Sequence, residues 1–214
     1  PKKYDGTAQG TVLPMAGRIG RANDFDRSVD YVRVADRADF TLSGDYTVSG
    51  WVNTDVIGGW QAFFGTYSNA GFIFALDDTA NTTLQFWDGT WRPSTTRVVP
   101  GEWSHVAYTR SGMDGRFYIN GSNVYTRSDA QATGNGGHLE LGGGGLTWAG
   151  LRFDGKVDEV ELASVRRTPN WIRASWKNQD DPAGFASFAA VQNGGAPIVI
   201  NGNATNVNAT TARL

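Results

Sequence analysis

The stretch Tyr46-Thr-Val-Ser-Gly-Trp-Val-Asn53 shows most clearly how this chain folds. Its residues are mostly β-branched or aromatic and alternate in character, which is typical of a strand and not of a helix. The alternation puts Tyr46, Val48 and Val52 on one face of the strand. Trp51 lies on the other face with two hydroxyl-bearing residues. We therefore expect a β-strand with an apolar inner face and a mixed outer face.

Runs of the same kind recur along most of the sequence and are separated by short polar segments. The further predicted strands are Asp30–Val34, Ala62–Tyr67, Gly71–Asp77, Leu84–Trp87, Trp103–Arg110, Arg116–Ile119, Asn123–Thr126, His138–Leu141 and Gly155–Ala163. Dipeptides that are strong hairpin-turn signals stand among them: Asp88-Gly89, Asp114-Gly115, Asn120-Gly121 and Asp154-Gly155. Many short strands without intervening helices predict an all-β fold, an antiparallel two-sheet β-sandwich.

The composition agrees with a β-rich globular domain and argues against several classes of function. The chain has 214 residues and 23.1 kDa, with 19 basic side chains, 21 acidic side chains and 28 glycines. A net charge of −2 gives no indication of a nucleic-acid or anionic-membrane surface. The absence of cysteine excludes disulfides, thiol catalysis and zinc–cysteine sites. No apolar run approaches the length of a transmembrane helix, so we expect no membrane insertion.

One short helix is expected near the C-terminal end of the domain. Thr168 is a good N-cap, Pro169 suits the first helical position, and the stretch to about Lys177 carries an apolar stripe. The last residues of the chain are small, polar and repetitive. We therefore divide the chain into a domain over residues 1–187 and a tail over residues 188–214.

The tail contains one β-prone run, Pro197–Ile200, among polar residues. Such a run favours addition to an exposed sheet edge, because its main chain hydrogen-bonds to the edge strand. One hypothesis is therefore that residues 190–214 link neighbouring copies of the chain.

Four segments in this order resemble a known family. They are Gly17–Val32, Tyr46–Val52, the pair Gly101–Arg110 with Phe117–Gly121, and Phe153–Leu162. Together they resemble the laminin-G-like, concanavalin A-like lectin-glucanase jelly rolls of bacterial multidomain surface proteins. The resemblance implies a lectin-like or adhesive role outside the cell or at its surface. The tail resembles the first strand of an immunoglobulin-like or fibronectin-type repeat, which implies a longer parent chain.

Glycoside hydrolases share this fold, so catalysis has to be sought in particular residues. Retaining hydrolases need two carboxyl groups about 5 Å apart, and the laminarinase-type enzymes place them in a Glu-x-Asp-x-x-Glu strand motif. That motif is absent, and Glu159 and Glu161, the same-face pair among the four glutamates, are interpreted as solvated strand charges. His105 is expected to be a structural histidine with satisfied hydrogen bonds. We therefore predict no catalytic residues and no enzyme.

Asp158 is the candidate for a structural metal site. In Val157-Asp-Glu-Val-Glu-Leu162 it is expected to share a strand face with Val160 and Leu162. Its carboxylate would then lie on the apolar side, where a partner must offset the cost of burial. The resemblance implies that a matching aspartate helps to bind calcium, which takes six to eight oxygen ligands. The remaining candidate ligands are Asp5, Asp26 and Asp30. The alternative is that Asp158 only accepts hydrogen bonds from backbone amides.

Several tryptophans lie in or beside polar loops: Trp60, Trp87, Trp91 and Trp148. A flat indole beside polar side chains suits a sugar ring, whose apolar face is edged by hydroxyl groups. Asp88 and Arg92 directly follow two of these tryptophans and are predicted ligand-binding residues with them. Further polar neighbours are proposed at Asn53, Gln61, Asn69 and Arg152. The alternative is that these indoles cover the ends of the sheets, a packing role that we assign to Trp51, Trp103, Trp171 and Trp176.

Three hypotheses for the function follow. The first is a non-catalytic binding module that recognises a glycan or a cell-surface polysaccharide. The second is a structural subunit of an extracellular assembly, linked by strand addition through the tail. The third, a glycoside hydrolase, lacks its carboxylate signature.

Overall fold

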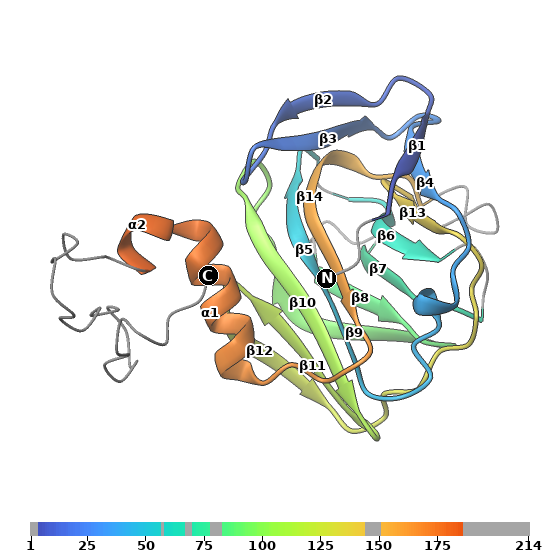
Figure 1. The fold of residues 1–214 in the computed structure, drawn as a ribbon, viewed down its shortest axis with the longest axis vertical. Helices are drawn as coiled ribbons and strands as arrows, with labels where there is room; N and C mark the ends of the chain where they lie inside the picture. Colours follow the sequence, from blue (N-terminus) through green and yellow to red (C-terminus); the bar gives the residue numbers. More distant parts are fainter. Residues whose placement is uncertain (1–3, 57, 67–69, 78–82, 144–150, 186–214) are drawn as a thin grey trace, which may run out of the picture.

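The computed structural model describes residues 4–56, 58–66, 70–77, 83–143 and 151–185. Within these ranges the chain forms two antiparallel sheets of seven strands each, packed face to face (Figure 1). The helices lie in the C-terminal part, apart from a short 3-10 turn, η1 (Ala38–Phe40). The antiparallel two-sheet β-sandwich predicted from the sequence is therefore confirmed.

Each sheet combines strands that are distant in the sequence. Sheet A has the order β1-β4-β13-β6-β7-β8-β9. Its strands are β1 (Gly6–Gln9), β4 (Tyr31–Val34), β13 (Leu139–Leu141), β6 (Gln61–Thr66), β7 (Ile73–Leu76), β8 (Thr83–Trp87) and β9 (Trp91–Arg97). Sheet B has the order β12-β11-β10-β5-β14-β3-β2. Its strands are β12 (Ser122–Arg127), β11 (Asp114–Ile119), β10 (Ser104–Ser111), β5 (Tyr46–Thr54), β14 (Asp154–Ala163), β3 (Arg21–Asp26) and β2 (Leu13–Ala16).

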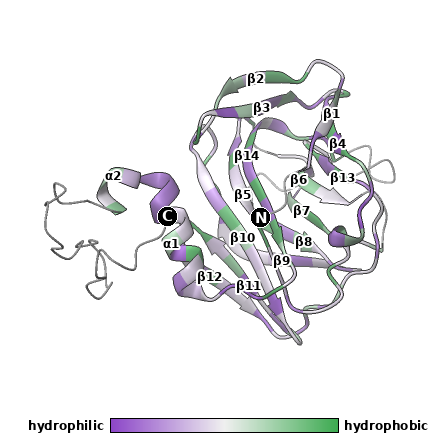
Figure 2. Cartoon of the chain, viewed as in Figure 1, coloured by the Kyte–Doolittle hydropathy of each residue, from purple (hydrophilic) through white to green (hydrophobic). Residues whose placement is uncertain are grey.

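The inner faces of the two sheets meet in an aromatic core. Phe86 of sheet A stacks on Tyr108 of sheet B with ring centroids 4.0 Å apart. In β5 the residues that face this core are Tyr46, Val48 and Val52, as the alternation predicts. Figure 2 shows hydrophobic and hydrophilic residues interspersed along the strands. Because large aromatic side chains each bury about 150–250 Å², this core is the main source of stability.

Helix α1 (Pro169–Asp180) lies on the outer face of sheet B, beside β12 (Figure 1). The Oγ1 atom of Thr168 accepts a hydrogen bond from the amide of Trp171 at 3.2 Å, so the predicted N-cap is confirmed. Ile172 is fully buried against Ala107 and Tyr118 of the sheet. A short helix, α2 (Pro182–Phe185), follows. The outer face of sheet B is therefore covered in part by the chain's own helix.

Some local predictions differ from the structure. The alternation does not predict β1, β2, β3 or β9. Strand β9 contains Pro93 among mostly polar residues, so its pairing with β8 defines it. The Asp154-Gly155 dipeptide is not a turn but the start of β14. There Gly155 approaches Asn53 so closely that a Cβ atom would lie 2.1 Å from its carbonyl oxygen. Asp114-Gly115 also begins a strand, and the turn falls at Gly112-Met113.

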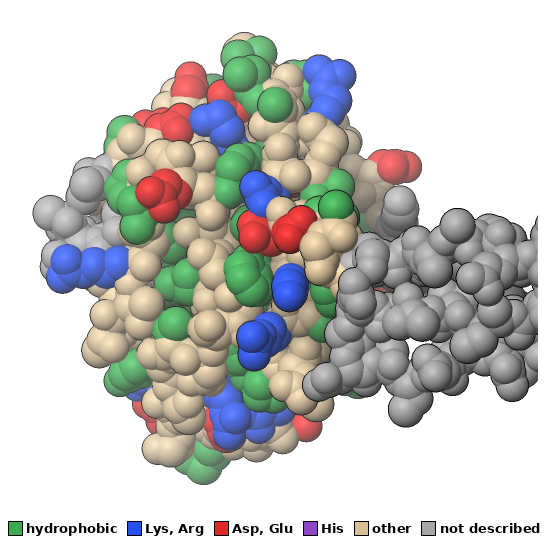
Figure 3. Space-filling model, turned by 90° about the vertical axis from the view of Figure 1, so that its left-hand side faces the viewer, with side chains coloured by type: hydrophobic (Ala, Val, Ile, Leu, Met, Phe, Trp, Pro, Cys, Tyr) green, Lys and Arg blue, Asp and Glu red, His purple; other side chains and the backbone are tan. Residues whose placement is uncertain are grey.

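The predicted tail, with Pro197–Ile200 and the strand-addition segment 190–214, lies outside the described residues. The face shown in Figure 3 mixes basic, acidic and hydrophobic side chains, in agreement with the small net charge. No helix in the described part of the chain has the length and apolar character that crossing a bilayer demands.

Candidate functional site

Three tryptophans come together on the outer face of sheet A, the face turned away from the core. Trp60 precedes β6, whereas Trp87 ends β8 and Trp91 begins β9. The ring centroids of Trp60 and Trp91 are 4.5 Å apart, and those of Trp87 and Trp91 are 5.4 Å apart. All three side chains are half-buried. We call these three residues the tryptophan cluster.

The strand pairing explains why these indoles meet. Trp87 and Trp91 are register partners across the β8–β9 hairpin, so both side chains leave the sheet on the same face. The surface beneath the cluster consists of buried aliphatic side chains: Ala62, Ile73, Ala75 and Leu151. Two of them are alanines, which let the large rings lie close to the sheet. The sequence thereby forms an aromatic surface from one loop and one hairpin.

A set of charged side chains lies on the same outer face. Glu140 is fully buried; its Oε1 atom accepts a hydrogen bond from Arg33 Nη2 at 2.9 Å and lies 3.1 Å from His138 Nε2. The guanidinium carbons of Arg33 and Arg152 lie 5.0 Å and 4.5 Å from the ring centroid of Tyr31, within the range of cation–π attraction. We call these five residues the charged set.

The tryptophan cluster and the charged set lie on one line across sheet A. Glu140 pairs with Gly65, Gly65 pairs with Ile73, and Ile73 pairs with Trp87. Neighbouring strands are about 4.8 Å apart, so three steps separate the two groups by about 14 Å. The outer face of sheet A is therefore aromatic at one end and charged at the other.

Asp88 and Arg92, predicted to contact a ligand beside the tryptophans, lie inside the protein. Arg92 Nε is 2.7 Å from Asp88 Oδ1, and Arg92 Nη1 is 3.0 Å from Asp129 Oδ2. Burial raises the pKa of Asp88, although Arg92 and a backbone amide oppose this shift. Because Trp87 and Trp91 point outward, the residues that follow them point inward. This arrangement is a buried structural ion pair.

The other predicted neighbours of the tryptophans lie partly in the interior and partly on the outer face of sheet A. Trp148 and Asn69 lie outside the described residues. Asn53 and Gln61 are buried, and their side-chain amides hydrogen-bond to backbone groups. Arg152 belongs to the charged set on the outer face of sheet A, where its guanidinium lies over the Tyr31 ring.

The prediction that Asp158 shares a face with Val160 and Leu162 is wrong. A β-bulge follows Asp158 in β14, and Glu159 adopts a left-handed conformation with φ of 48°. A bulge inserts an extra residue and reverses the alternation beyond it. Val160 and Leu162 therefore pack against the core, while Asp158 is paired with Trp51 on the outer side of sheet B.

The carboxylate of Asp158 is used by the backbone. Its Oδ2 atom accepts a hydrogen bond from the amide of Ile19 at 2.9 Å, and its Oδ1 atom accepts one from the amide of Glu159 at 2.9 Å. This is the amide-capping alternative that the sequence left open.

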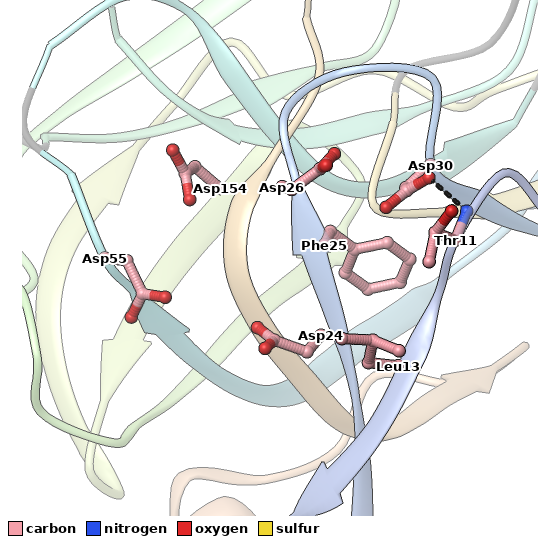
Figure 4. Close-up of a pocket in the computed structure, with 8 residues that line it drawn as sticks. All are labelled: Thr11, Leu13, Asp24, Phe25, Asp26, Asp30, Asp55 and Asp154. Atoms are coloured by element: carbon pink, nitrogen blue, oxygen red, sulfur yellow. Dashed lines mark hydrogen bonds between the residues drawn. The ribbon is translucent and has the colours of Figure 1, made fainter.

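Asp26 and Asp30, two of the other predicted calcium ligands, line a depression of about 190 Å³ (Figure 4). The residues around it are Thr11, Leu13, Asp24, Phe25, Asp26, Asp30, Asp55 and Asp154. Asp30 Oδ1 accepts a hydrogen bond from the Thr11 amide at 2.6 Å, and Asp26 accepts one from Ser28, which lowers the pKa of Asp26. Burial and the neighbouring carboxylates raise the pKa of Asp154.

The four predicted calcium ligands are not all brought together, because only Asp26 and Asp30 line the depression. Asp5 is exposed, and neither Asp5 nor Asp158 lines the depression. Across the described ranges, no three histidine, aspartate or glutamate side chains are grouped as a metal ion requires. We therefore derive no role for calcium from these residues.

Fold and site together define a class of protein: a lectin-type jelly roll with an aromatic surface on the outer face of one sheet. The profile of the Laminin_G_3 family matches residues 26–173. The chain belongs to this family, part of the concanavalin A-like lectin/glucanases superfamily. The curated protein sequences give no match.

Solved structures with the same fold include carbohydrate-binding proteins. Domain 4 of AbnA, an extracellular arabinanase from Geobacillus stearothermophilus, in complex with arabinotriose, has a TM-score of 0.65 and 22% identity; 78% of this chain and 86% of that one are covered. A protein from Bacteroides ovatus assigned to carbohydrate binding has a TM-score of 0.60 and 22% identity, and the match covers 84% of this chain and 55% of that one. A structure of botulinum neurotoxin type C, whose cell entry depends on two ganglioside molecules, has a TM-score of 0.63 and 11% identity. That match covers 82% of this chain and 46% of the neurotoxin chain. At these identities the likeness shows the fold.

The sequence did not single out Glu140, Arg33 or Tyr31 as site residues. Arg33 and Glu140 each stand in a short strand between inward-facing apolar residues, and Tyr31 begins β4 two residues before Arg33, so alternation was enough to place all three on the outer face. Their meeting depends on the pairing of β4 with β13, which are more than a hundred residues apart in the sequence. Such a pairing has no local signal.

Proposed function

We propose that this domain is a carbohydrate-binding module whose binding surface is the outer face of sheet A. The observation that carries the proposal is the tryptophan cluster, three half-buried indoles whose ring centroids lie 4.5 Å and 5.4 Å apart. Binding sites for small molecules are mostly aromatic and apolar, with a few polar groups that fix orientation. The charged set supplies such groups about 14 Å away on the same face.

The apolar faces of sugar rings explain the choice of ligand. A pyranose or furanose ring presents C–H groups on a face and hydroxyl groups around its edge. Indole rings remove those C–H groups from water, and polar side chains at the rim hydrogen-bond to the hydroxyl groups. The bound arabinotriose in domain 4 of AbnA supports a sugar ligand for a domain of this fold.

The module is proposed to act by binding alone, as a part of a secreted or surface protein. Retaining hydrolysis needs a pair of carboxyl groups about 5 Å apart, whereas the charged set contains one carboxyl group, that of Glu140, which is already bonded to Arg33. The extracellular location of the arabinanase supports the proposed location.

A glycan array followed by calorimetry tests this proposal. Trp60→Ala and Trp91→Ala are each expected to weaken binding of the glycan that the wild type selects by at least about tenfold, as truncated aromatic hot spots do. Trp171→Ala is the matched control, because that tryptophan is half-buried on α1 beside sheet B. Unchanged binding in the first two variants, with circular dichroism showing folded protein, contradicts the proposal.

A further inference from the structure

Arg27, which follows β3 of sheet B, has a backbone conformation that is unfavourable for its residue type. Its φ is 63°, in the left-handed region that glycine adopts readily and that strains a residue with a Cβ atom. Such strain persists only where the surrounding contacts fix it, and it is common at functional sites. The amide of Arg27 donates to the carbonyl of Phe153 at 3.0 Å, which fixes the backbone from one side.

The guanidinium of Arg27 lies against the Gly58-Gly59 segment, which precedes β6 of sheet A. Its Nη1 atom donates to the carbonyl of Gly58 at 3.1 Å. A Cβ atom built on Gly59 would lie 1.9 Å from Nη2 of Arg27, so the guanidinium occupies the space that a larger residue would need. Gly58 and Gly59 have φ of 91° and 71°. The two glycines therefore allow the arginine to contact their backbone directly.

A second side chain binds the same carbonyl group. Gln61 is 0% exposed, and its Nε2 atom donates to the carbonyl of Gly58 at 3.3 Å. Its Oε1 atom accepts a hydrogen bond from the amide of Asp154 at 3.1 Å, which connects it to β14 of sheet B. Two adjacent glycines lose much conformational freedom when they are ordered. Arg27 and Gln61 together provide the contacts that offset this cost.

Trp60 directly follows the two glycines and belongs to the tryptophan cluster, with its ring centroid 4.5 Å from that of Trp91. We infer that Arg27 is a positioning residue for Trp60. By fixing the preceding glycines, its guanidinium keeps this indole against Trp91 before a ligand arrives. A preformed site loses less conformational entropy on binding. The inference rests on the proposed function for its consequence, which is tighter glycan binding.

Nuclear magnetic resonance of the free protein tests the positioning. Arg27→Gly removes the guanidinium and suits a φ of 63°, so the fold should tolerate it. We expect the indole N–H signal of Trp60, assigned by its absence in Trp60→Ala, to shift or broaden in this variant, and the signal of Trp51 to stay unchanged. An unchanged Trp60 signal overturns the inference.

Arg21→Ala is the matched control for this measurement. Arg21 also donates to a backbone carbonyl, that of Pro14 at 3.4 Å, but on the exposed β2–β3 hairpin. Its substitution should leave the Trp60 signal in place. A change of the same size in Arg21→Ala would show a general response to the loss of an arginine and would overturn the inference as well. Because this comparison needs no glycan, it is independent of the proposed function.

A double-mutant cycle tests the consequence for binding. With the glycan that the wild type selects on the array, calorimetry should show roughly fivefold weaker binding in Arg27→Gly, the cost of ordering a side chain on binding. In a Trp60→Ala background the same substitution should have no further effect, because Arg27 acts through Trp60.

Two results of this cycle contradict the inference. Wild-type affinity in Arg27→Gly would show that the position of Trp60 does not depend on the guanidinium in a way that matters for binding. An equal loss of affinity in the Trp60→Ala background would make Arg27 a direct ligand contact. The proposed function is judged separately, from the effect of Trp60→Ala and Trp91→Ala on the array.

Discussion

The two outer faces of the sandwich carry the same kind of side chain in different surroundings. On sheet B, Trp51 is 1% exposed and its Nε1 atom donates to Gln179 of α1 at 2.5 Å. On sheet A, Trp60, Trp87 and Trp91 are half-buried and pack against one another. No helix among the described elements lies on that face.

This difference teaches how to interpret aromatic residues on a sheet face. A face covered by the chain's own helix is part of the packing and contributes to stability. We propose that a face whose indoles remain half-exposed is the one that binds a ligand. We therefore expect substitutions on the side of sheet B and in the interior to change stability, and substitutions in the tryptophan cluster to change binding.

The largest expected effect concerns the buried ion pair next to the tryptophan cluster. Arg92→Leu leaves the fully buried carboxylate of Asp88 without its charged partner. We expect the free energy of unfolding to fall by about 3–5 kcal/mol, as measured by urea denaturation, with glycan affinity per folded molecule unchanged. Adding Asp88→Asn should recover part of the loss. A loss of glycan binding at unchanged stability would instead identify Arg92 as a ligand contact.

The next effect is a pH dependence on the sheet B side. His105 is 2% exposed, its Nδ1 atom has no partner among the described residues, and burial lowers its pKa to about 4. The unfolded chain, with a pKa of about 6.5, binds the proton more readily. Stability should therefore fall as the pH is lowered from 6.5 to 4, by roughly 3 kcal/mol in total.

His105→Phe provides the control for this pH dependence. The phenyl ring keeps the aromatic contact with Trp51, whose centroid lies 5.4 Å from the imidazole. Urea denaturation between pH 4 and pH 7 should then show a flatter stability profile. An equally steep profile in the variant would show that another group titrates.

The smallest effect concerns the helix that covers sheet B. Thr168→Ala removes the N-cap hydrogen bond to the Trp171 amide and should lower the free energy of unfolding by about 1 kcal/mol. Thr168→Ser keeps the acceptor and should change little. Glycan affinity should be the same in both variants. A drop in affinity would mean that α1 supports the binding face.

Much of the fold could be predicted from the sequence because its signals are local. The alternation in Tyr46–Asn53 gave the inner face of β5, and Thr168 with Pro169 gave the start of α1. The predicted turn at Asn120-Gly121 is also confirmed, since these residues have φ of 47° and 73°. These features depend on a few consecutive residues.

The remaining features depend on contacts that the sequence does not reveal. The bulge at Glu159 reverses the side on which Asp158 lies, and no residue preference marks it. The expectation that His105 has satisfied hydrogen bonds was wrong for Nδ1, because the imidazole packs against Trp51 of the neighbouring strand β5. The charged set needs β4 and β13 as neighbours, which is a property of the topology.

Nuclear magnetic resonance of the indole N–H groups tests the central claim most directly. The glycan that the wild type selects on the array is titrated into the ¹⁵N-labelled protein. The account predicts shifts for the indole signals of Trp60, Trp87 and Trp91, and none for those of Trp51 and Trp171. Shifts at Trp171 with unchanged signals from the tryptophan cluster would place the binding surface on sheet B and contradict it.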